Sequence, residues 1–312
     1  MMNKLLYKLV LIIRFAKSDY GGLIKTLKEP TGNITALAFI ENGTVLASAG
    51  TDKTIKIWNL KEDKIIRILS GHTDIIWALE YKENGCLASG SDDKTIKIWD
   101  IKDGKLIKTL EGHTSHVYSL VHLDKERLAS GSFDNTIKIW DINEGKLIKT
   151  LEGHSAWVSA LAYNKNGYLA SGSGDNSIKI WDLSKLKVIR TLKGHTGRVR
   201  GLIYVNNEFL ASGSGDKTIK IWDVTEGALI RTLEGHTDWV RGLKMIGKGC
   251  LASCSRDRTI KIWSLSQGEL IRTLDGHSNW VEALACTDEG VLATGSYDKT
   301  IRIWNLKEDM LE

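Results

Sequence analysis

The sequence predicts an all-β protein built from seven repeats, each of which forms a four-stranded antiparallel sheet. The chain has 30 glycines and one proline, a composition typical of many tight turns between short strands. The repeats show no convincing helical period. The strongest observation is a strand ending in Ile-x-Ile-Trp, whose tryptophan recurs every 41 residues, at Trp58, Trp99, Trp140, Trp181, Trp222, Trp263 and Trp304.

Each repeat divides into four strands, labelled a to d in chain order. Strand a follows a Gly-His pair and alternates, as in Val158–Leu161, and strands b, c and d read Leu-Ala-Ser-Gly-Ser, Thr-Ile-Lys-Ile-Trp and Lys-Leu-Ile-Lys-Thr-Leu. Pairs such as Asn84-Gly85 favour the a–b turn, and an aspartate with a small polar neighbour favours the b–c turn. One such sheet cannot bury both its faces. We therefore expect the sheets to stack around an axis and close into a ring, which protects their edges.

Charge and composition indicate a globular protein. Hydrophobic residues make up 42% of the chain and charged residues 26%, and the net charge of +5 is low for a dedicated nucleic-acid binder. Much of this excess comes from the lysine in each Thr-Ile-Lys-Ile-Trp strand, which we interpret as solvated. The four cysteines show no metal-ligand spacing, so we expect reduced thiols and a cytoplasmic protein, with a nuclear location as the alternative. They are Cys86, Cys250, Cys254 and Cys286.

The first 20 residues differ from everything that follows. The apolar run from Leu9 to Ile13 is too short to span a bilayer, and Lys8 and Arg14 interrupt any signal-peptide core. We expect residues 1–20 to be a helical or disordered extension of a single domain at 21–312. A membrane-surface or targeting segment, and a sequence that is not natively part of the domain, are the alternatives.

The Gly-His pairs, the turn aspartates and the Trp-Asp pairs, at this spacing, resemble the tryptophan–aspartate (WD) repeat family of β-propellers. The resemblance covers residues 23–305 and implies a monomeric seven-bladed β-propeller with four antiparallel strands per blade. The last repeat stops soon after Trp304, and residues 23–27 read as a strand d with no repeat before them. We expect Leu23–Leu27 to pair with the strand containing Ile301–Trp304, as N-terminal strands of the family commonly do, and to close the ring.

The resemblance also implies that a histidine, a serine or threonine, an aspartate and a tryptophan form a hydrogen-bonded tetrad in each of blades 2 to 7. Their recurrence argues against a Ser-His-Asp hydrolase, because an enzyme needs one nucleophile and not six. In the first repeat Glu29-Pro30 replaces Gly-His, so we expect blade 1 to be the least stable. The expected tetrads are His72, Ser89, Asp93 and Trp99; His113, Ser130, Asp134 and Trp140; His154, Ser171, Asp175 and Trp181; His195, Ser212, Asp216 and Trp222; His236, Ser253, Asp257 and Trp263; and His277, Thr294, Asp298 and Trp304.

Other chemistry has little support in the sequence. There is no phosphate-binding G-x-x-x-x-G-K-[ST] loop, no H-E-x-x-H and no G-x-S-x-G. His116 and His122 lie outside the Gly-His set, and the neighbouring His113 is assigned to a tetrad. We therefore expect no catalytic residue, no metal and no cofactor.

Four tryptophans, Trp77, Trp157, Trp239 and Trp280, lie outside the 41-residue series. By resemblance, the positions flanking the first Val or Ile of strand a, and the residue before the turn aspartate, face the top rim of the central channel. Blade by blade these positions hold Asn33, Thr35 and Thr51; Ile75, Trp77 and Asp92; His116, Tyr118 and Phe133; Trp157, Ser159 and Gly174; Arg198, Arg200 and Gly215; Trp239, Arg241 and Arg256; and Trp280, Glu282 and Tyr297.

This set is rich in the residue types that dominate interface hot spots. It predicts a scaffold or adaptor that binds a protein or peptide on its top face. The competing interpretation is that the aromatic side chains only pack against one another and plug the channel. The predicted partner-binding residues are Trp77, Tyr118, Phe133, Trp157, Arg198, Arg200, Trp239, Arg241, Arg256, Trp280, Glu282 and Tyr297.

The arginines of blades 5 and 6 suggest a narrower class of partner. Guanidinium groups bind carboxylate and phosphate oxygens bidentately, which favours an acidic or phosphorylated peptide, as in ubiquitin-ligase substrate receptors of this family. Pairing of the arginines with Glu282 is the competing interpretation. Nucleic-acid binding, which arginine and aromatic residues also favour, is the alternative of a different class.

Overall fold

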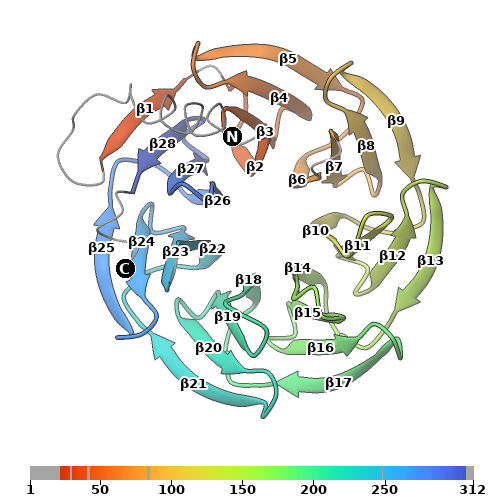
Figure 1. Ribbon diagram of the computed structural model, residues 1–312, viewed down its shortest axis with the longest axis vertical. Helices are drawn as coiled ribbons and strands as arrows, with labels where there is room; N and C mark the ends of the chain where they lie inside the picture. The colour runs from red at the N-terminus through yellow and green to blue at the C-terminus, as the bar shows by residue number, and fades with distance from the viewer. Residues whose placement is uncertain (1–21, 29, 41–42, 83–84, 248, 307–312) are drawn as a thin grey trace, which may run out of the picture.

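The computed structural model describes residues 22–28, 30–40, 43–82, 85–247 and 249–306, which form seven four-stranded antiparallel sheets around a central axis (Figure 1). The predicted seven-bladed propeller is confirmed. The expected extension at residues 1–20, Glu29 and Asn84 lie outside the described residues. Within the described part, no helix is long and apolar enough to cross a membrane.

In every blade, strand a lies nearest the axis and strand d lies at the rim (Figure 1). Blade 1 contains β2 (Ile34–Ile40), β3 (Val45–Gly50), β4 (Thr54–Asn59) and β5 (Lys64–Ser70). Blade 2 contains β6 (Ile76–Lys82), β7 (Cys86–Ser91), β8 (Ile96–Asp100) and β9 (Lys105–Leu110). Blade 3 contains β10 (Val117–His122), β11 (Arg127–Ser132), β12 (Ile137–Asp141) and β13 (Lys146–Leu151). Blade 4 contains β14 (Val158–Tyr163), β15 (Tyr168–Ser173), β16 (Ile178–Asp182) and β17 (Lys187–Leu192).

The remaining blades repeat this order. Blade 5 contains β18 (Val199–Tyr204), β19 (Phe209–Ser214), β20 (Ile219–Asp223) and β21 (Ala228–Leu233). Blade 6 contains β22 (Val240–Ile246), β23 (Cys250–Ser255), β24 (Ile260–Ser264) and β25 (Glu269–Leu274). Blade 7 contains β26 (Val281–Cys286), β27 (Val291–Ser296), β28 (Ile301–Asn305) and, as its fourth strand, β1 (Leu23–Leu27).

The ring closes through β1, the red strand beside the blue β28 in Figure 1. The two strands pair antiparallel, with Leu23 opposite Trp304 and Leu27 opposite Ile301. Leu27 is buried in the same cluster as Ile301 and Ile303. The closure predicted from the missing strand d is therefore confirmed, and it combines backbone hydrogen bonds with apolar burial.

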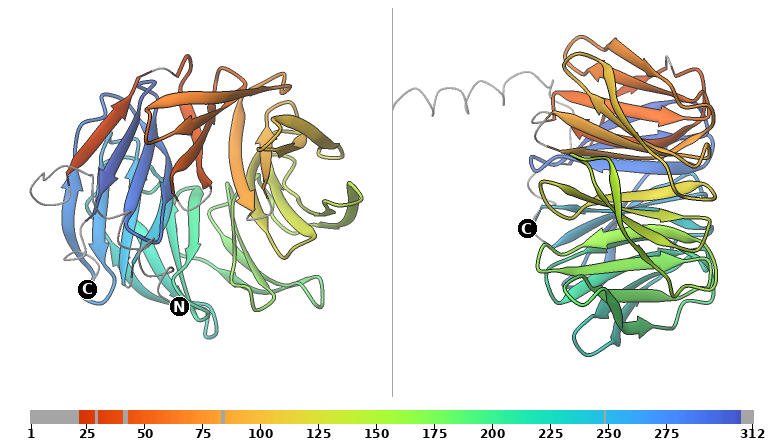
Figure 2. Two further views of the ribbon diagram at one scale, coloured as in Figure 1. Left: turned by 45° about the horizontal axis from the view of Figure 1, so that its top comes forward. Right: turned by 90° about the vertical axis from the view of Figure 1, so that its right-hand side faces the viewer.

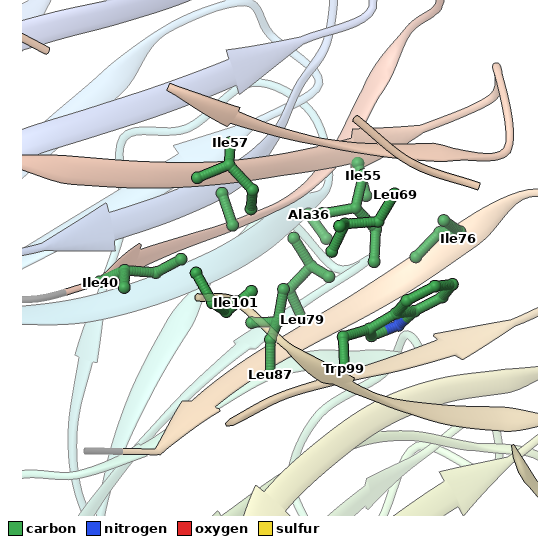
Figure 3. Packing of buried hydrophobic residues seen from close by; sticks show 12 residues of the cluster. Ala36, Ile40, Ile55, Ile57, Leu69, Ile76, Leu79, Leu87, Trp99 and Ile101 are labelled. Carbon is green, nitrogen blue, oxygen red and sulfur yellow. The ribbon is translucent and has the colours of Figure 1, made fainter. Parts of the chain in front are cut away.

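The core consists of seven apolar layers, each of which lies between two neighbouring blades. Figure 3 shows the layer in which Ile55 and Leu69 of blade 1 meet Ile76 and Trp99 of blade 2. Each sheet thus buries its faces against two neighbours, which is why one sheet alone would not be stable. Seen from the side, the ring is a short cylinder (Figure 2), and its outer strands, such as β9 and β13, follow the circumference (Figure 1).

Basic side chains connect the blades at the rim. Arg67 of β5 donates hydrogen bonds to the carbonyl oxygens of Lys102 and Asp103 in the c–d turn of blade 2, over 2.7 and 3.0 Å. Arg190 contacts the c–d turn of blade 5 in the same way.

The recurring lysine of strand c corrects one sequence interpretation. We expected these lysines to be solvated, but Lys56 and Lys138 are buried. In five blades the ammonium group donates to a threonine of strand d, as Lys138 does to Thr150 over 2.8 Å. The aliphatic part of the side chain can be buried because the charged end keeps a polar partner.

The topology places one set of loops at one end of the cylinder. Because the four strands of a blade alternate in direction, the d–a loops and the b–c turns lie at the same end, which we call the top face. In each b–c turn the residue after the aspartate has a positive φ, from 65° at Lys53 to 73° at Arg258. This left-handed residue reverses the chain tightly enough to keep the aspartate beside the d–a loop.

Candidate partner-binding surface

The predicted tetrad residues meet in each of blades 2 to 7. In blade 3, His113 Nδ1 lies 2.7 Å from Asp134 Oδ2 and His113 Nε2 lies 2.7 Å from Ser130 Oγ, which also accepts a hydrogen bond from Trp140 Nε1 over 2.8 Å. Blade 7 has the same arrangement with Thr294 in place of serine. These bonds connect the d–a loop, the b–c turn and strands b and c, and so hold the top face in place.

The tetrad aspartates are strongly stabilised as carboxylates. Burial alone would raise their pKa, but hydrogen bonds from the histidine, from the following Thr or Ser and from the backbone outweigh it and hold each pKa well below its usual range. The side chains of these aspartates are 5% to 12% exposed. Each tetrad is therefore a closed polar network whose groups already have partners.

Blade 1 replaces the missing histidine with other partners. Trp58 Nε1 still donates to Ser48 Oγ over 2.8 Å. Asp52 accepts hydrogen bonds from Thr31 Oγ1, over 2.5 Å, and from the Lys56 ammonium group. These bonds outweigh burial and lower the pKa of Asp52. The weaker stability that we predicted for this blade stays a prediction.

All twelve predicted surface residues form one continuous contact network, but they divide into two groups. The first, which we call the mouth cluster, occupies the position after the first Val or Ile of strand a. Arg200 connects distant blades here, because its guanidinium carbon lies 5.9 Å from the centre of the Tyr118 ring. The mouth cluster consists of Trp77, Tyr118, Arg200, Arg241 and Glu282.

Three residues at the same position are buried and not exposed on the surface, which corrects our sequence-based inventory. One of them is the predicted surface residue Glu282, and the other two are Thr35 and Ser159. Their hydroxyl groups donate to the carbonyl oxygens of Ile76 and Val199, each in the next blade. Small hydroxyl residues at this position therefore connect strands a of neighbouring blades, whereas larger residues reach over the channel.

Glu282 neutralises two of the four arginines. The Glu282 side chain is 1% exposed. One of its carboxylate oxygens accepts a hydrogen bond from Arg241 Nε, and the other accepts one from Arg256 Nε over 3.2 Å. The competing interpretation of internal pairing is thus correct for Arg241 and Arg256. Among the described residues, no carboxylate lies within ion-pair distance of Arg198 or Arg200.

Arg200 is a half-buried cation whose Nε is shielded from solvent. Burial, reinforced by the charge of Arg241, lowers its pKa to about 9. Its Nε has no hydrogen-bond partner among the described residues. The charge is stabilised partly by aromatic rings, since the guanidinium carbon lies 5.6 Å from the Trp157 ring centre and 5.7 Å from that of Trp239.

The second group forms an aromatic–arginine row that runs over blades 3 to 7. The guanidinium carbon of Arg198 lies 4.5 Å from the ring centre of Trp157 and 5.7 Å from that of Trp239. The guanidinium carbon of Arg256 lies 4.4 Å from the ring centre of Trp239 and 4.1 Å from that of Trp280. The ring centres of Phe133 and Trp157 lie 4.2 Å apart with the ring planes tilted by 31°, and those of Tyr297 and Trp280 lie 5.4 Å apart. Phe133 and Trp280 are 38% and 36% exposed. In order, the aromatic–arginine row is Phe133, Trp157, Arg198, Trp239, Arg256, Trp280 and Tyr297.

An acidic group, Asp92 of blade 2, lies beside the blade 3 end of the aromatic–arginine row, because His116 contacts both Asp92 and Phe133. Asp92 accepts a hydrogen bond from Trp77 Nε1 over 2.7 Å and lies 2.5 Å from His116 Nδ1. Burial raises the pKa of Asp92, against the effect of His116. His116 stacks near Tyr118 and Phe133. Sequence reasoning placed His116 and Asp92 at the rim but left both out of the predicted set, because neither is a typical hot-spot residue.

Comparison with known proteins is consistent with this geometry. The family description "WD domain, G-beta repeat" matches residues 21–59, 63–100, 104–141, 145–182, 186–223, 227–264 and 268–305. The crystal structure of the WD40 β-propeller domain of Doa1 superposes with a TM-score of 0.84 at 28% identity, covering 93% of this chain and 98% of that one.

Curated relatives match over short segments. Mitochondrial division protein 1 of Malassezia globosa is 34% identical over 68 residues, 22% of this chain and 10% of that protein. The "Non-functional target of rapamycin complex subunit LST8-2" of Arabidopsis thaliana is 41% identical over 44 residues, 14% of each protein. The matches thus span a small fraction of these relatives, whereas the family description matches seven consecutive repeats. This chain belongs to the WD-repeat family of β-propellers.

Proposed function

We propose that this protein is a non-catalytic scaffold that binds a protein or peptide partner across its top face. The observation that carries the proposal is the aromatic–arginine row. Its tryptophans supply large contact areas, and the intervening arginines hold the rings in fixed positions, so little conformational entropy is lost on binding. Aromatic and arginine side chains gathered on one face favour an interaction surface over a chance cluster.

The distribution of sequence differences among the repeats supports the same proposal. The positions that make the tetrads and the core are nearly identical from blade to blade, because the fold requires them. The top-face positions hold a different residue set in every blade. The propeller therefore presents an irregular, asymmetric surface on a nearly symmetric frame, which suits the recognition of one specific partner.

An acidic or phosphorylated segment is the partner class that the charges favour. Arg198 and Arg200 have no carboxylate partner among the described residues, so an incoming anion would supply one. Nucleic acid fits less well. Bases bind by stacking on free ring faces, and in the aromatic–arginine row the tryptophans already have guanidinium groups within 4.1 to 5.7 Å of their centres.

Quantitative affinity capture tests the proposal. The test variant combines Trp157→Ala, Trp239→Ala and Trp280→Ala. The matched control removes three exposed apolar side chains from the rim, Ile107, Ile189 and Ile230, by substitution with alanine. We expect at least a tenfold loss of the captured partner with the test variant and an unchanged amount with the control. A partner that binds the test variant as well as the wild type would contradict the proposal.

A further inference from the structure

The top face has a hollow between blades 4 and 5. The residue before the turn aspartate is glycine in these two blades, Gly174 and Gly215, whereas the other five carry Thr51, Asp92, Phe133, Arg256 and Tyr297. A cavity of about 370 Å³ opens here, lined by Gly174, Gly197, Gly215, Asn176, Thr196, Arg198 and Trp239. We call it the blade 4–5 hollow.

The glycines keep the hollow open. A Cβ atom at Gly174 would lie 2.6 Å from Trp157 Nε1, and one at Gly197 would lie 2.5 Å from the backbone nitrogen of Asp216. Glycine is therefore required at both positions if the neighbouring groups are to stay in place. At Gly215 a Cβ would meet Arg198 N at 3.5 Å and the Trp239 ring at 3.6 Å, which is ordinary contact. A larger side chain is sterically allowed there, and it would fill the hollow.

The lining of the hollow is cationic and rich in hydrogen-bond donors. Thr196 and Asn176 contribute a hydroxyl and an amide, and none of the lining residues is acidic. The nearest acids in sequence, Asp175 and Asp216, are held by the tetrad histidines His154 and His195.

Arg198 has the features of an anion receptor. It is exposed, and its contacts with Trp157 and Trp239 hold the guanidinium group at the edge of the hollow. Arg256 is the internal comparison, because it has the same kind of place between Trp239 and Trp280 but is paired with Glu282. The two arginines therefore differ mainly in that one still lacks a carboxylate.

We propose that the blade 4–5 hollow is a subsite for an oxyanion carried by the bound protein, either the carboxylate of an acidic residue or the phosphate of a phosphorylated one. The inference rests on the proposed function and makes it more specific. Arg198 supplies a bidentate fork, Thr196 and Asn176 supply neutral donors, and the half-buried charge of Arg200, beside Trp157 and Trp239, adds to the positive potential. Both anions present the oxygen acceptors that this donor set requires.

Degenerate nonapeptide pools test the subsite directly. Four fluorescent pools differ only at the fixed central residue, which is glutamate, phosphoserine, glutamine or serine, and binding is measured by anisotropy. We expect the glutamate or the phosphoserine pool to bind the wild type at least tenfold more tightly than its neutral counterpart. The preferred pool identifies which of the two anions the site takes.

Three variants locate the effect. Arg198→Gln and Gly215→Tyr, which gives blade 5 the residue of blade 7, should both abolish the preference. The control Arg190→Gln, which removes a positive charge from the rim of blade 4 outside the top face, should retain it. A preference that persists in Arg198→Gln, or equal binding of charged and neutral pools to the wild type, would overturn the subsite. Displacement of the peptides by a 12-nucleotide single strand, dependent on Arg198, would also overturn it and would assign the hollow to nucleic acid.

The two proposals fail in different ways. If all four pools bind the wild type equally, and all are lost in Trp157→Ala plus Trp239→Ala, the top face binds peptides and only the subsite is wrong. If no pool binds and the affinity-captured partner is insensitive to both tryptophans, the proposed function itself is wrong.

Discussion

Ser130 illustrates at the residue scale why residue types found in hydrolases are structural here. Its Oγ accepts from the Trp140 indole and lies 2.7 Å from His113 Nε2, and the residue has no exposed surface. A nucleophile needs access to a substrate and a base that is free to take its proton. Ser130 has no access, and both ring nitrogens of His113 already have partners.

Removal of one tetrad histidine should destabilise the propeller without changing its fold. His113→Ala leaves the buried Asp134 carboxylate and the Ser130 hydroxyl short of partners, so we expect a loss of about 2–4 kcal/mol. His116→Ala, three residues away and partly exposed, is the control and should cost less than about 1 kcal/mol. Urea unfolding measures both. Equal effects of the two substitutions would contradict the structural role of the tetrad.

The six tetrad aspartates make the free energy of unfolding depend on pH in the acidic range. Their pKa is held below the value of about 3.9 that an unfolded aspartate has. The unfolded state therefore binds protons first, so the stabilisation is complete above about pH 4 and is lost as the pH falls below it. Urea midpoints measured from pH 6 to pH 2.5 should show this decline, and a smaller decline in Asp134→Asn. A midpoint that rises on acidification would refute it.

Some residue roles could be predicted from the sequence and others could not. Tetrad positions recur every 41 residues, so one repeat identifies the others. The sequence raised the pairing of arginines with Glu282 as one interpretation but could not decide which arginines pair, because this arrangement of three residues from two blades occurs once. The burial of Thr35 and Ser159 depends on the carbonyl groups of the next blade, which periodicity does not reveal.

At the scale of elements, the outer strands carry features that keep them from pairing with the edge strand of another molecule. In each of blades 1 to 6 the register of pairing between strands c and d shifts at the tryptophan of strand c. This β-bulge twists an edge strand that carries exposed isoleucines such as Ile107 and Ile230. Bulges and adjacent lysines or arginines are common means of keeping an edge strand from pairing with another chain.

The closing strand β1 gives the element-scale prediction. Leu27 is 5% exposed and packs with Ile301 and Ile303, so Leu27→Ala should cost about 2–4 kcal/mol and loosen the ring. Leu23→Ala in the same strand is the control, because Leu23 is 39% exposed and its removal should change stability by less than about 0.5 kcal/mol. Thermal unfolding, with hydrogen exchange of the β28 amides, reports both. Undiminished protection of β28 in Leu27→Ala would argue against closure by β1.

The identity of this element followed from the sequence, because a strand d without a repeat and a repeat without a strand d predict each other. Its register did not. The register shifts between Leu23 and Lys25, which lie opposite Trp304 and Ile303, and the apolar pattern of residues 23–27 does not indicate this shift. Likewise, the hollow between blades 4 and 5 depends on glycines whose effect appears only when Trp157 and Trp239 are placed beside them.

At the scale of the whole molecule, a nearly symmetric ring carries an asymmetric face. The seven apolar layers and the six complete tetrads make the frame rigid, and they use the same residues in each blade. The aromatic–arginine row, the mouth cluster, the Asp92 group and the blade 4–5 hollow use positions that the fold leaves open. The residues that the repeats share stabilise the propeller, and we propose that the positions at which the repeats differ recognise the partner.

Site-specific photocrosslinking tests the central claim, that the top face is where a partner binds. Benzoylphenylalanine is placed singly at position 157, 239 or 280 in the aromatic–arginine row, and at position 107, 189 or 230 on the rim as controls. Crosslinks to a captured partner are then quantified by mass spectrometry. We expect crosslinks from the three positions of the row and none above background from the rim. Crosslinks from the rim positions, with none from the row, would contradict it.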